Sequence, residues 1–224
     1  MMPKKWVLLS LCVCFLCLAV QVRAVDNDKK KEILEQLPQL GPPEDKKPIG
    51  AQDFFPLSQG WEWVYSVTAY DPAGKEVSKE RLTIKNLASV ELEGKKVYPQ
   101  EYRRKSVNTF YYAQESKGIA AIAVKQGAEG KPNNFEHPLY MFITPLAKGT
   151  EVTSGELKLV IDDLKDTVTV PAGTFNNCVK ITTINTKNNE EITAWFAEGV
   201  GRLKSVIKRP DGRKSEILLE SYKK

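Results

Sequence analysis

The sequence predicts an all-β protein built on a single, strongly curved antiparallel sheet, in the form of a half-barrel or an open barrel. From Phe54 onward, apolar and polar residues alternate with a period of two, which is typical of strands with one buried face. Turn-forming residues separate these runs at short, regular intervals. No segment after Phe54 carries the apolar stripe of an amphipathic helix, so we expect no helical layer over the sheet.

The first 24 residues have the features of a secretory signal peptide. Lys4 and Lys5 precede an uncharged, apolar run of fifteen residues, and small or modest side chains follow it up to Ala24. A span of the bilayer needs about twenty such residues. We therefore expect a signal helix that is cleaved near Ala24 and a mature chain without a transmembrane span. The mature protein is expected in the periplasm or at the cell surface of a bacterium.

Removal of the signal peptide changes the charge of the chain. The whole chain has 33 basic and 28 acidic residues, a net charge of +5, and loss of Lys4, Lys5 and Arg23 lowers this to +2. Such a small net charge does not predict nucleic-acid binding. Residues 25–52 are rich in charge and contain four prolines, so they are expected to form a disordered tether ahead of a β domain over residues 53–224.

Cysteine use leaves two questions open. Three of the four cysteines lie in the signal peptide, each after a large aliphatic residue that lipoprotein processing does not favour, and lipidation there stays undecided. Cys178 is the single cysteine of the mature chain, which rules out an internal disulfide bond. It is either an inert buried residue or a reactive or intermolecularly paired thiol.

The first predicted strand is the most aromatic one. Trp61, Trp63 and Tyr65 fall on one face, and the turn Asp71-Pro72-Ala73-Gly74 ends the strand. The remaining predicted strands are Val77–Lys85, Ser89–Glu93, Lys96–Lys105, Val107–Gln114, Gly118–Lys125, Leu139–Thr144, Glu151–Ile161, Asp166–Val170, Cys178–Thr186, Glu190–Glu198, Arg202–Arg209 and Lys214–Tyr222. The sections 94–119 and 173–200 share a glycine turn, two strands and an aromatic pair, through either an internal duplication or recurrent turn chemistry.

The sequence argues against catalysis. It contains no phosphate-binding loop, dinucleotide fingerprint, zinc-protease motif or nucleophile elbow, so no catalytic residue, metal site or cofactor is predicted. His137 is the only histidine, and it is expected in a solvated loop. Asp162, Asp163 and Asp166 are expected to surround a polar hairpin, because their spacing does not match a calcium loop.

The aromatic residues are the best candidates for a binding function. An ordinary core explains most of them, but a curved sheet without covering helices can leave some of them lining an apolar pocket. The residues that we expect in such a lining are Trp61, Trp63, Tyr65, Tyr112 and Phe196.

Two segments carry a resemblance to a known group of proteins. Val170–Lys180 and Trp195–Ser205 resemble the pattern VPAGTFxxCxK … YAPGVGxVK of uncharacterised bacterial exported proteins called TapB-like, with Glu198 in place of the frequent proline. The resemblance covers Phe54–Tyr222 and names no catalytic residue. It implies a curved antiparallel sheet, more distantly similar to the half-barrel of LolA/LolB-type lipoprotein carriers, which hold acyl chains in an apolar concavity.

Three functions remain open at this point. The first is a non-enzymatic protein of the cell envelope that binds an apolar small molecule, a lipid or a partner protein on its curved sheet. The second is an envelope hydrolase acting on wall or polysaccharide material, and the third is a structural module of a surface assembly. The oligomeric state is not predicted.

Overall fold

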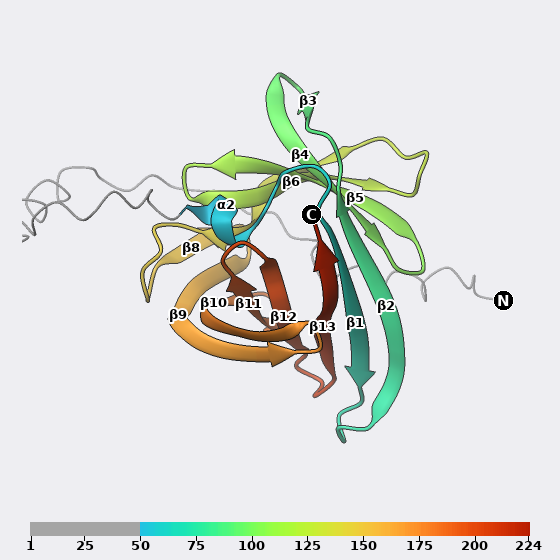
Figure 1. Cartoon of the computed structure of the whole chain (residues 1–224), viewed down its shortest axis with the longest axis vertical. Helices are drawn as coiled ribbons and strands as arrows, with labels where there is room; N and C mark the ends of the chain where they lie inside the picture. The colour runs from blue at the N-terminus through green and yellow to red at the C-terminus, as the bar shows by residue number, and fades with distance from the viewer. Residues whose placement is uncertain (1–49) are drawn as a thin grey trace, which may run out of the picture.

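Thirteen antiparallel strands form one strongly curved sheet in the computed structural model, which describes residues 50–224 (Figure 1). The one helix in this part of the chain, α2, has four residues. The elements are α2 (Ala51–Phe54), β1 (Glu62–Tyr70), β2 (Glu76–Asn86), β3 (Val90–Leu92), β4 (Lys95–Arg103), β5 (Val107–Glu115), β6 (Gly118–Gln126), β7 (Asn133–Ile143), β8 (Glu151–Ser154), β9 (Leu157–Val170), β10 (Gly173–Asn185), β11 (Glu191–Ala197), β12 (Gly201–Lys208) and β13 (Lys214–Lys223). The predicted all-β fold is confirmed, and the signal peptide and nearly all of the tether lie outside the described residues.

The sheet closes almost completely on itself, leaving one seam. Its strand order is β7-β6-β5-β4-β2-β1-β13-β12-β11-β10-β9-β8, and β3 pairs with β4 off this path. The edge strands β7 and β8 face each other at the seam, where the Ser154 hydroxyl donates a hydrogen bond of 2.6 Å to the carbonyl oxygen of Pro138. The curvature is therefore greater than that of a half-barrel.

Local sequence explains the first hairpin and one close approach of two strands. After β1, the Asp71 carboxylate accepts hydrogen bonds from the backbone N–H groups of Ala73 and Lys75, and Gly74 adopts the positive φ that the turn requires. Gly118 is needed for a different reason, since a Cβ atom there would lie 2.0 Å from the carbonyl oxygen of Phe142 on the paired strand. Glycine thus permits the close approach of β6 and β7.

Two of the loop predictions were wrong. Asp162, Asp163 and Asp166 lie within the continuous strand β9 and do not surround a hairpin. Asp163 accepts hydrogen bonds from the N–H groups of Leu164 and Lys165, and the register with β10 shifts here, so the carboxylate bends the strand without ending it. His137 is half-buried on β7, because the strand pairs with β6 well before Leu139.

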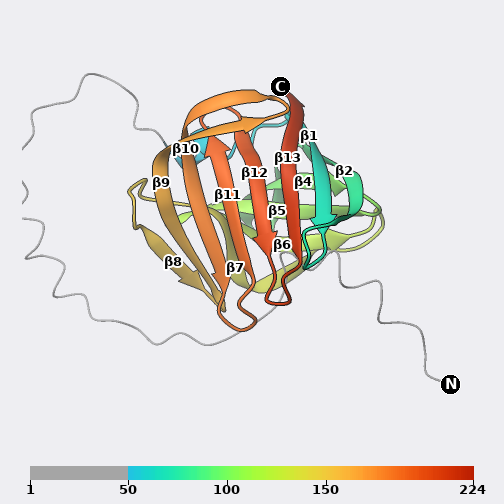
Figure 2. The same cartoon turned by 90° about the horizontal axis from the view of Figure 1, so that it is seen from below.

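The long hairpin of β9 and β10 folds over one end of the curved sheet (Figure 2). Its tip reaches β13, where the N–H group of Ala172 donates to the carbonyl oxygen of Leu219 at 3.1 Å. Val168 and Cys178 pack in the apolar cluster beneath this tip together with Leu203. Cys178 is free and fully buried, and burial raises its pKa, which favours the buried alternative of the two that the sequence left open.

No helix within residues 50–224 has both the length and the apolar character needed to cross a bilayer.

Candidate binding site on the concave face

The residues that precede β1 fill the concave side of the sheet. We call residues 51–57, which comprise α2 and the extended residues after it, the plug segment. The ring of Phe54 stacks on that of Phe142, with centroids 5.4 Å apart. The ring of Phe55 lies 5.2 Å from that of Tyr112 and 6.4 Å from that of Phe196. Because α2 contacts β6, β7 and β12, the plug segment joins distant parts of the strand order.

Few hydrogen bonds hold the plug segment to the sheet. The N–H group of Gly199 donates to the carbonyl oxygen of Asp53 at 2.7 Å. The side-chain amide of Asn86, at the end of β2, donates to the carbonyl oxygens of Pro56 and Ser58, both at 2.9 Å. Asn86 is only 2% exposed, so these bonds are protected from water. Asn86 acts as a latch between β2 and the plug segment.

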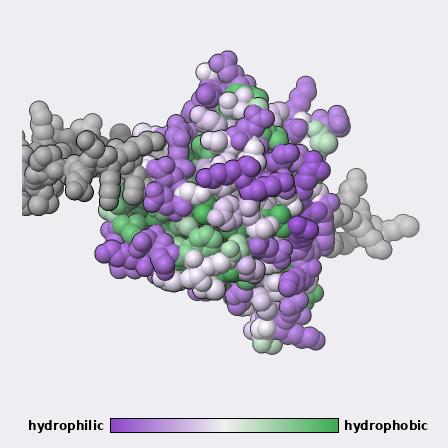
Figure 3. Space-filling model, in the orientation of Figure 1, coloured by the Kyte–Doolittle hydropathy of each residue, from purple (hydrophilic) through white to green (hydrophobic). Residues whose placement is uncertain are grey.

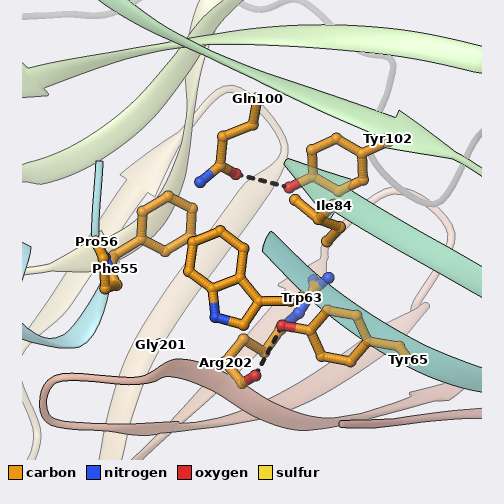
Figure 4. A pocket seen from close by; sticks show the side chains of 9 residues that line it. All are labelled: Phe55, Pro56, Trp63, Tyr65, Ile84, Gln100, Tyr102, Gly201 and Arg202. Carbon is orange, nitrogen blue, oxygen red and sulfur yellow. Dashed lines mark hydrogen bonds between the residues drawn. The ribbon is translucent and has the colours of Figure 1, made fainter. Parts of the chain in front are cut away.

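A small cavity remains where the plug segment meets the sheet (Figure 4). Its volume is about 20 Å³, and one water molecule needs roughly 10–15 Å³ on this measure. The concave side is therefore packed, and an acyl chain does not fit while the plug segment is in place. The cavity is lined by Phe55, Pro56, Trp63, Tyr65, Ile84, Gln100, Tyr102, Gly201 and Arg202.

One end of this cavity is polar. The Tyr102 hydroxyl lies 2.8 Å from the Tyr112 hydroxyl and donates to the Gln100 side-chain oxygen at 3.2 Å. The Tyr65 hydroxyl donates to the backbone carbonyl oxygen of Arg202 at 2.8 Å (Figure 4). The three phenols lie close enough to Arg202 to interact with its charge, and the Gln100 amide lines the same cavity.

Arg202 is the charged residue of the cavity. The residue is 8% exposed, and its guanidinium carbon lies 5.3 Å from the centroid of the Tyr65 ring, a cation–π contact. Within residues 50–224, no aspartate or glutamate forms an ion pair with Arg202. Buried arginine is ordinarily paired, because an uncompensated charge loses its hydration.

A β-bulge turns Arg202 inward. Trp195 of β11 pairs with Lys204 of β12, whereas the next residue, Phe196, pairs with Arg202. Leu203 is therefore an extra residue in β12, and strict alternation is interrupted at this point. Without the bulge, Arg202 would share the outer face with Lys204.

Burial raises the pKa of the three phenols around Arg202. Desolvation raises the pKa of Tyr65 to about 12, although the Arg202 charge opposes the shift. The pKa values of Tyr102 and Tyr112 are also raised, mainly by desolvation. Because the folded-state pKa exceeds the unfolded value of about 10, these tyrosines bind their protons more tightly in the native protein.

We expect an alkaline titration to reveal these phenols. Their contribution to stability is fully present below pH 10 and is lost as the pH rises toward 12 for Tyr65. The tyrosinate absorbance of the native protein should rise later than that of the urea-unfolded protein, in which all eight tyrosines ionise together. Tyr65→Phe should shrink the late phase of the native curve. Superimposable native and unfolded curves would contradict the burial of these hydroxyls.

The structure brings four of the five predicted lining residues to the concave side. Trp63 and Tyr65 line the cavity, and Tyr112 and Phe196 contact Phe55 of the plug segment. Trp61 instead stacks between Trp63 and Tyr222, with centroids at 5.3 and 6.2 Å. The part that these five residues play in binding stays a prediction.

Sequence reasoning missed the polar end of the cavity and the plug segment. The run Phe54-Phe55-Pro56-Leu57 just before the first strand was a usable signal, because consecutive apolar residues at a domain edge need a surface to cover. Gln100 and Tyr102 lie two apart on β4 and so share a face, which alternation could also have indicated. Arg202 gave no such signal.

No group of three or more histidine, cysteine, aspartate or glutamate side chains within residues 50–224 could hold a metal ion. The acidic side chains of β9 have structural partners: Asp162 accepts from the Thr182 hydroxyl at 2.5 Å, and Asp166 accepts from the Trp195 indole N–H at 2.8 Å.

No protein-family model and no curated protein matches this chain. Among solved structures, the chain is similar to a protein from Bacteroides fragilis described as exported and YmcC-like in fold, with 14% identity and a TM-score of 0.41, over 76% of this chain and 99% of that one. It is also similar to a protein from Parabacteroides distasonis described as a lipoprotein, with 20% identity and a TM-score of 0.33, over 76% and 99% of the two chains.

A third similar structure is a domain from Vibrio parahaemolyticus described as an outer membrane lipoprotein-sorting protein. Its identity is 10% and its TM-score 0.30, over 73% of this chain and 84% of that one. At these TM-scores the similarities carry no argument about function. The resemblance to the TapB-like group and to LolA/LolB-type carriers accordingly stays a prediction.

Proposed function

We propose that this protein is an exported, non-enzymatic binding protein of the cell envelope, and that its curved sheet accepts an apolar ligand in place of the plug segment. One observation carries the proposal. The concave face of the sheet is covered by seven residues from outside the sheet, and these insert Phe54, Phe55 and Leu57 into the space that the strands enclose.

The chemistry of the concave face supports an apolar ligand. The cluster behind the plug segment contains aromatic and aliphatic side chains from strands β5, β6, β7, β10 and β11. If the plug segment leaves, these side chains are exposed to water, and an acyl chain or another apolar group can restore their burial. The surface view adds a further point, since apolar residues gather over the region of β8 and β9 among hydrophilic surroundings (Figure 3).

The experiment is a titration of the mature protein with the neutral fluorescent probe N-phenyl-1-naphthylamine. We expect saturable binding with one probe per chain. Phe55→Ala should tighten binding about tenfold, because it weakens the group that competes for the site by roughly 1.4 kcal/mol or more. Phe175→Ala is the matched control, since it makes the same change to a ring that packs against the other apolar cluster, the one that contains Cys178 and Leu203.

The two variants separate the proposal from simple destabilisation. Equal tightening by both variants would mean that the probe reports loosened structure in general. Absence of saturable binding to the wild type and to Phe55→Ala would refute the apolar-ligand function.

A further inference from the structure

The buried charge of Arg202 has no counter-charge in the part of the chain that the structure describes. Its guanidinium group has five N–H donors. The Tyr65 hydroxyl and ring are the partners on one side. Since neither a phenol nor a π face neutralises a full charge, the polar end of the cavity is suited to an anion.

Other hydrogen-bonding groups line the same cavity as Arg202. Gln100 and Tyr102 come from β4, Tyr65 from β1 and Arg202 from β12, and all four side chains line one space (Figure 4). Gln100 is 3% exposed, and its side-chain oxygen already accepts from Tyr102. Its amide nitrogen points toward Phe55, so the guanidinium group of Arg202 is the charged donor of the cavity (Figure 4).

We propose that Arg202 binds the carboxylate head group of a fatty acid whose hydrocarbon chain takes the place of the plug segment. This inference rests on the proposed function and names the class of its ligand. The space near Arg202 is about the size of one small group, and among the described residues Arg202 is the only cation lining it. A planar monoanion matches one guanidinium fork, whereas a phosphate group is bulkier and carries more charge.

The apolar wall of the cavity indicates the direction that the hydrocarbon chain of the fatty acid would take. Phe55 and Pro56 of the plug segment form the side of the cavity opposite the polar end. Beyond Phe55, the track of the plug segment leads through Tyr112 and Phe196 to Phe142, where Phe54 stacks. A hydrocarbon chain attached to a carboxylate at Arg202 would follow the same track.

The experiment compares laurate, 1-dodecanol and dodecyl phosphate by isothermal titration calorimetry on the mature protein. The three ligands share the chain and differ in the head group. We expect laurate to bind at least tenfold more tightly than dodecanol, and dodecyl phosphate to bind more weakly than laurate. Arg202→Met should weaken laurate binding about tenfold to a hundredfold while changing dodecanol binding less than threefold.

Arg103→Met is the matched control, because the Arg103 side chain is exposed on β4 and pairs with Glu101. It should leave all three affinities unchanged. If Arg202→Met does not fold, the comparison of laurate with dodecanol on the wild type still decides. Equal affinities for these two ligands would overturn the carboxylate site and leave the proposed function intact.

Tighter binding of dodecyl phosphate than of laurate would also overturn the choice of a carboxylate. Absence of binding by all three ligands would overturn both this inference and the proposed function.

Discussion

Phe142→Ala is expected to lower the free energy of unfolding by about 3–5 kcal/mol, the range found when a buried phenylalanine is truncated. Phe142 is fully buried on β7, near the seam of the sheet. It stacks on Phe54 of the plug segment and meets Phe196 of β11 edge to face at 5.3 Å. Its removal therefore opens a cavity between the plug segment and the sheet, which neighbouring strands cannot close without breaking their ladders.

Urea unfolding followed by tryptophan fluorescence measures this loss, and the same substitution elsewhere on β7 provides its control. Phe135 is only partly buried, so Phe135→Ala should cost less than half as much. The double variant with Phe54→Ala isolates the contact itself, and a coupling energy of about 0.5–1.5 kcal/mol is expected for a stacked pair. A coupling near zero would show that Phe54 does not hold the plug segment against β7.

The fold was predictable because its signals are local. Alternation placed the strands, and turn residues such as Asp71 and Gly74 placed the hairpins. The errors arose where a polar residue was read as a chain reversal. Asp163 bends β9 through hydrogen bonds to the next two N–H groups, and the strand continues because β10 supplies partners on both sides of the bend. Strand pairing decided the outcome there, and a single sequence does not show pairing.

The site was only half predictable, for a related reason. Trp63 and Tyr65 lie two residues apart on β1, so the sequence could place both side chains on one face of the strand. Arg202 faces inward because of a bulge opposite Trp195 and Phe196, and a bulge is a property of two strands together. The covering of the concave face by residues 51–57 is likewise a long-range contact.

Asn86→Asp is expected to destabilise the protein by about 3–5 kcal/mol at pH 7, although the two side chains have nearly the same shape. Asn86 donates both of its amide hydrogens, to Pro56 and Ser58. An ionised aspartate has no donor, so a buried negative charge would face two carbonyl oxygens. The expected result is a weaker native state in which the plug segment is the part most easily released.

The pH dependence of this loss identifies its cause. Burial beside two carbonyl oxygens raises the folded-state pKa of the introduced carboxyl group above the unfolded value of about 3.9. The cost relative to wild type is therefore small below about pH 4, where the neutral acid can donate one hydrogen bond, and it grows as the pH rises toward the folded-state pKa. Urea unfolding at pH 4 and pH 7 tests this trend.

Asn188→Asp is the control for the Asn86→Asp measurement. Asn188 is exposed, and its side-chain oxygen accepts from the N–H group of Glu190, a role that a carboxylate retains. Its substitution should change stability by less than about 0.5 kcal/mol at either pH. If Asn86→Asp behaves like this control, the plug segment is not latched by Asn86. If only Asn86→Asp is destabilised and also binds N-phenyl-1-naphthylamine more tightly, the latch and the ligand site are linked through the same seven residues.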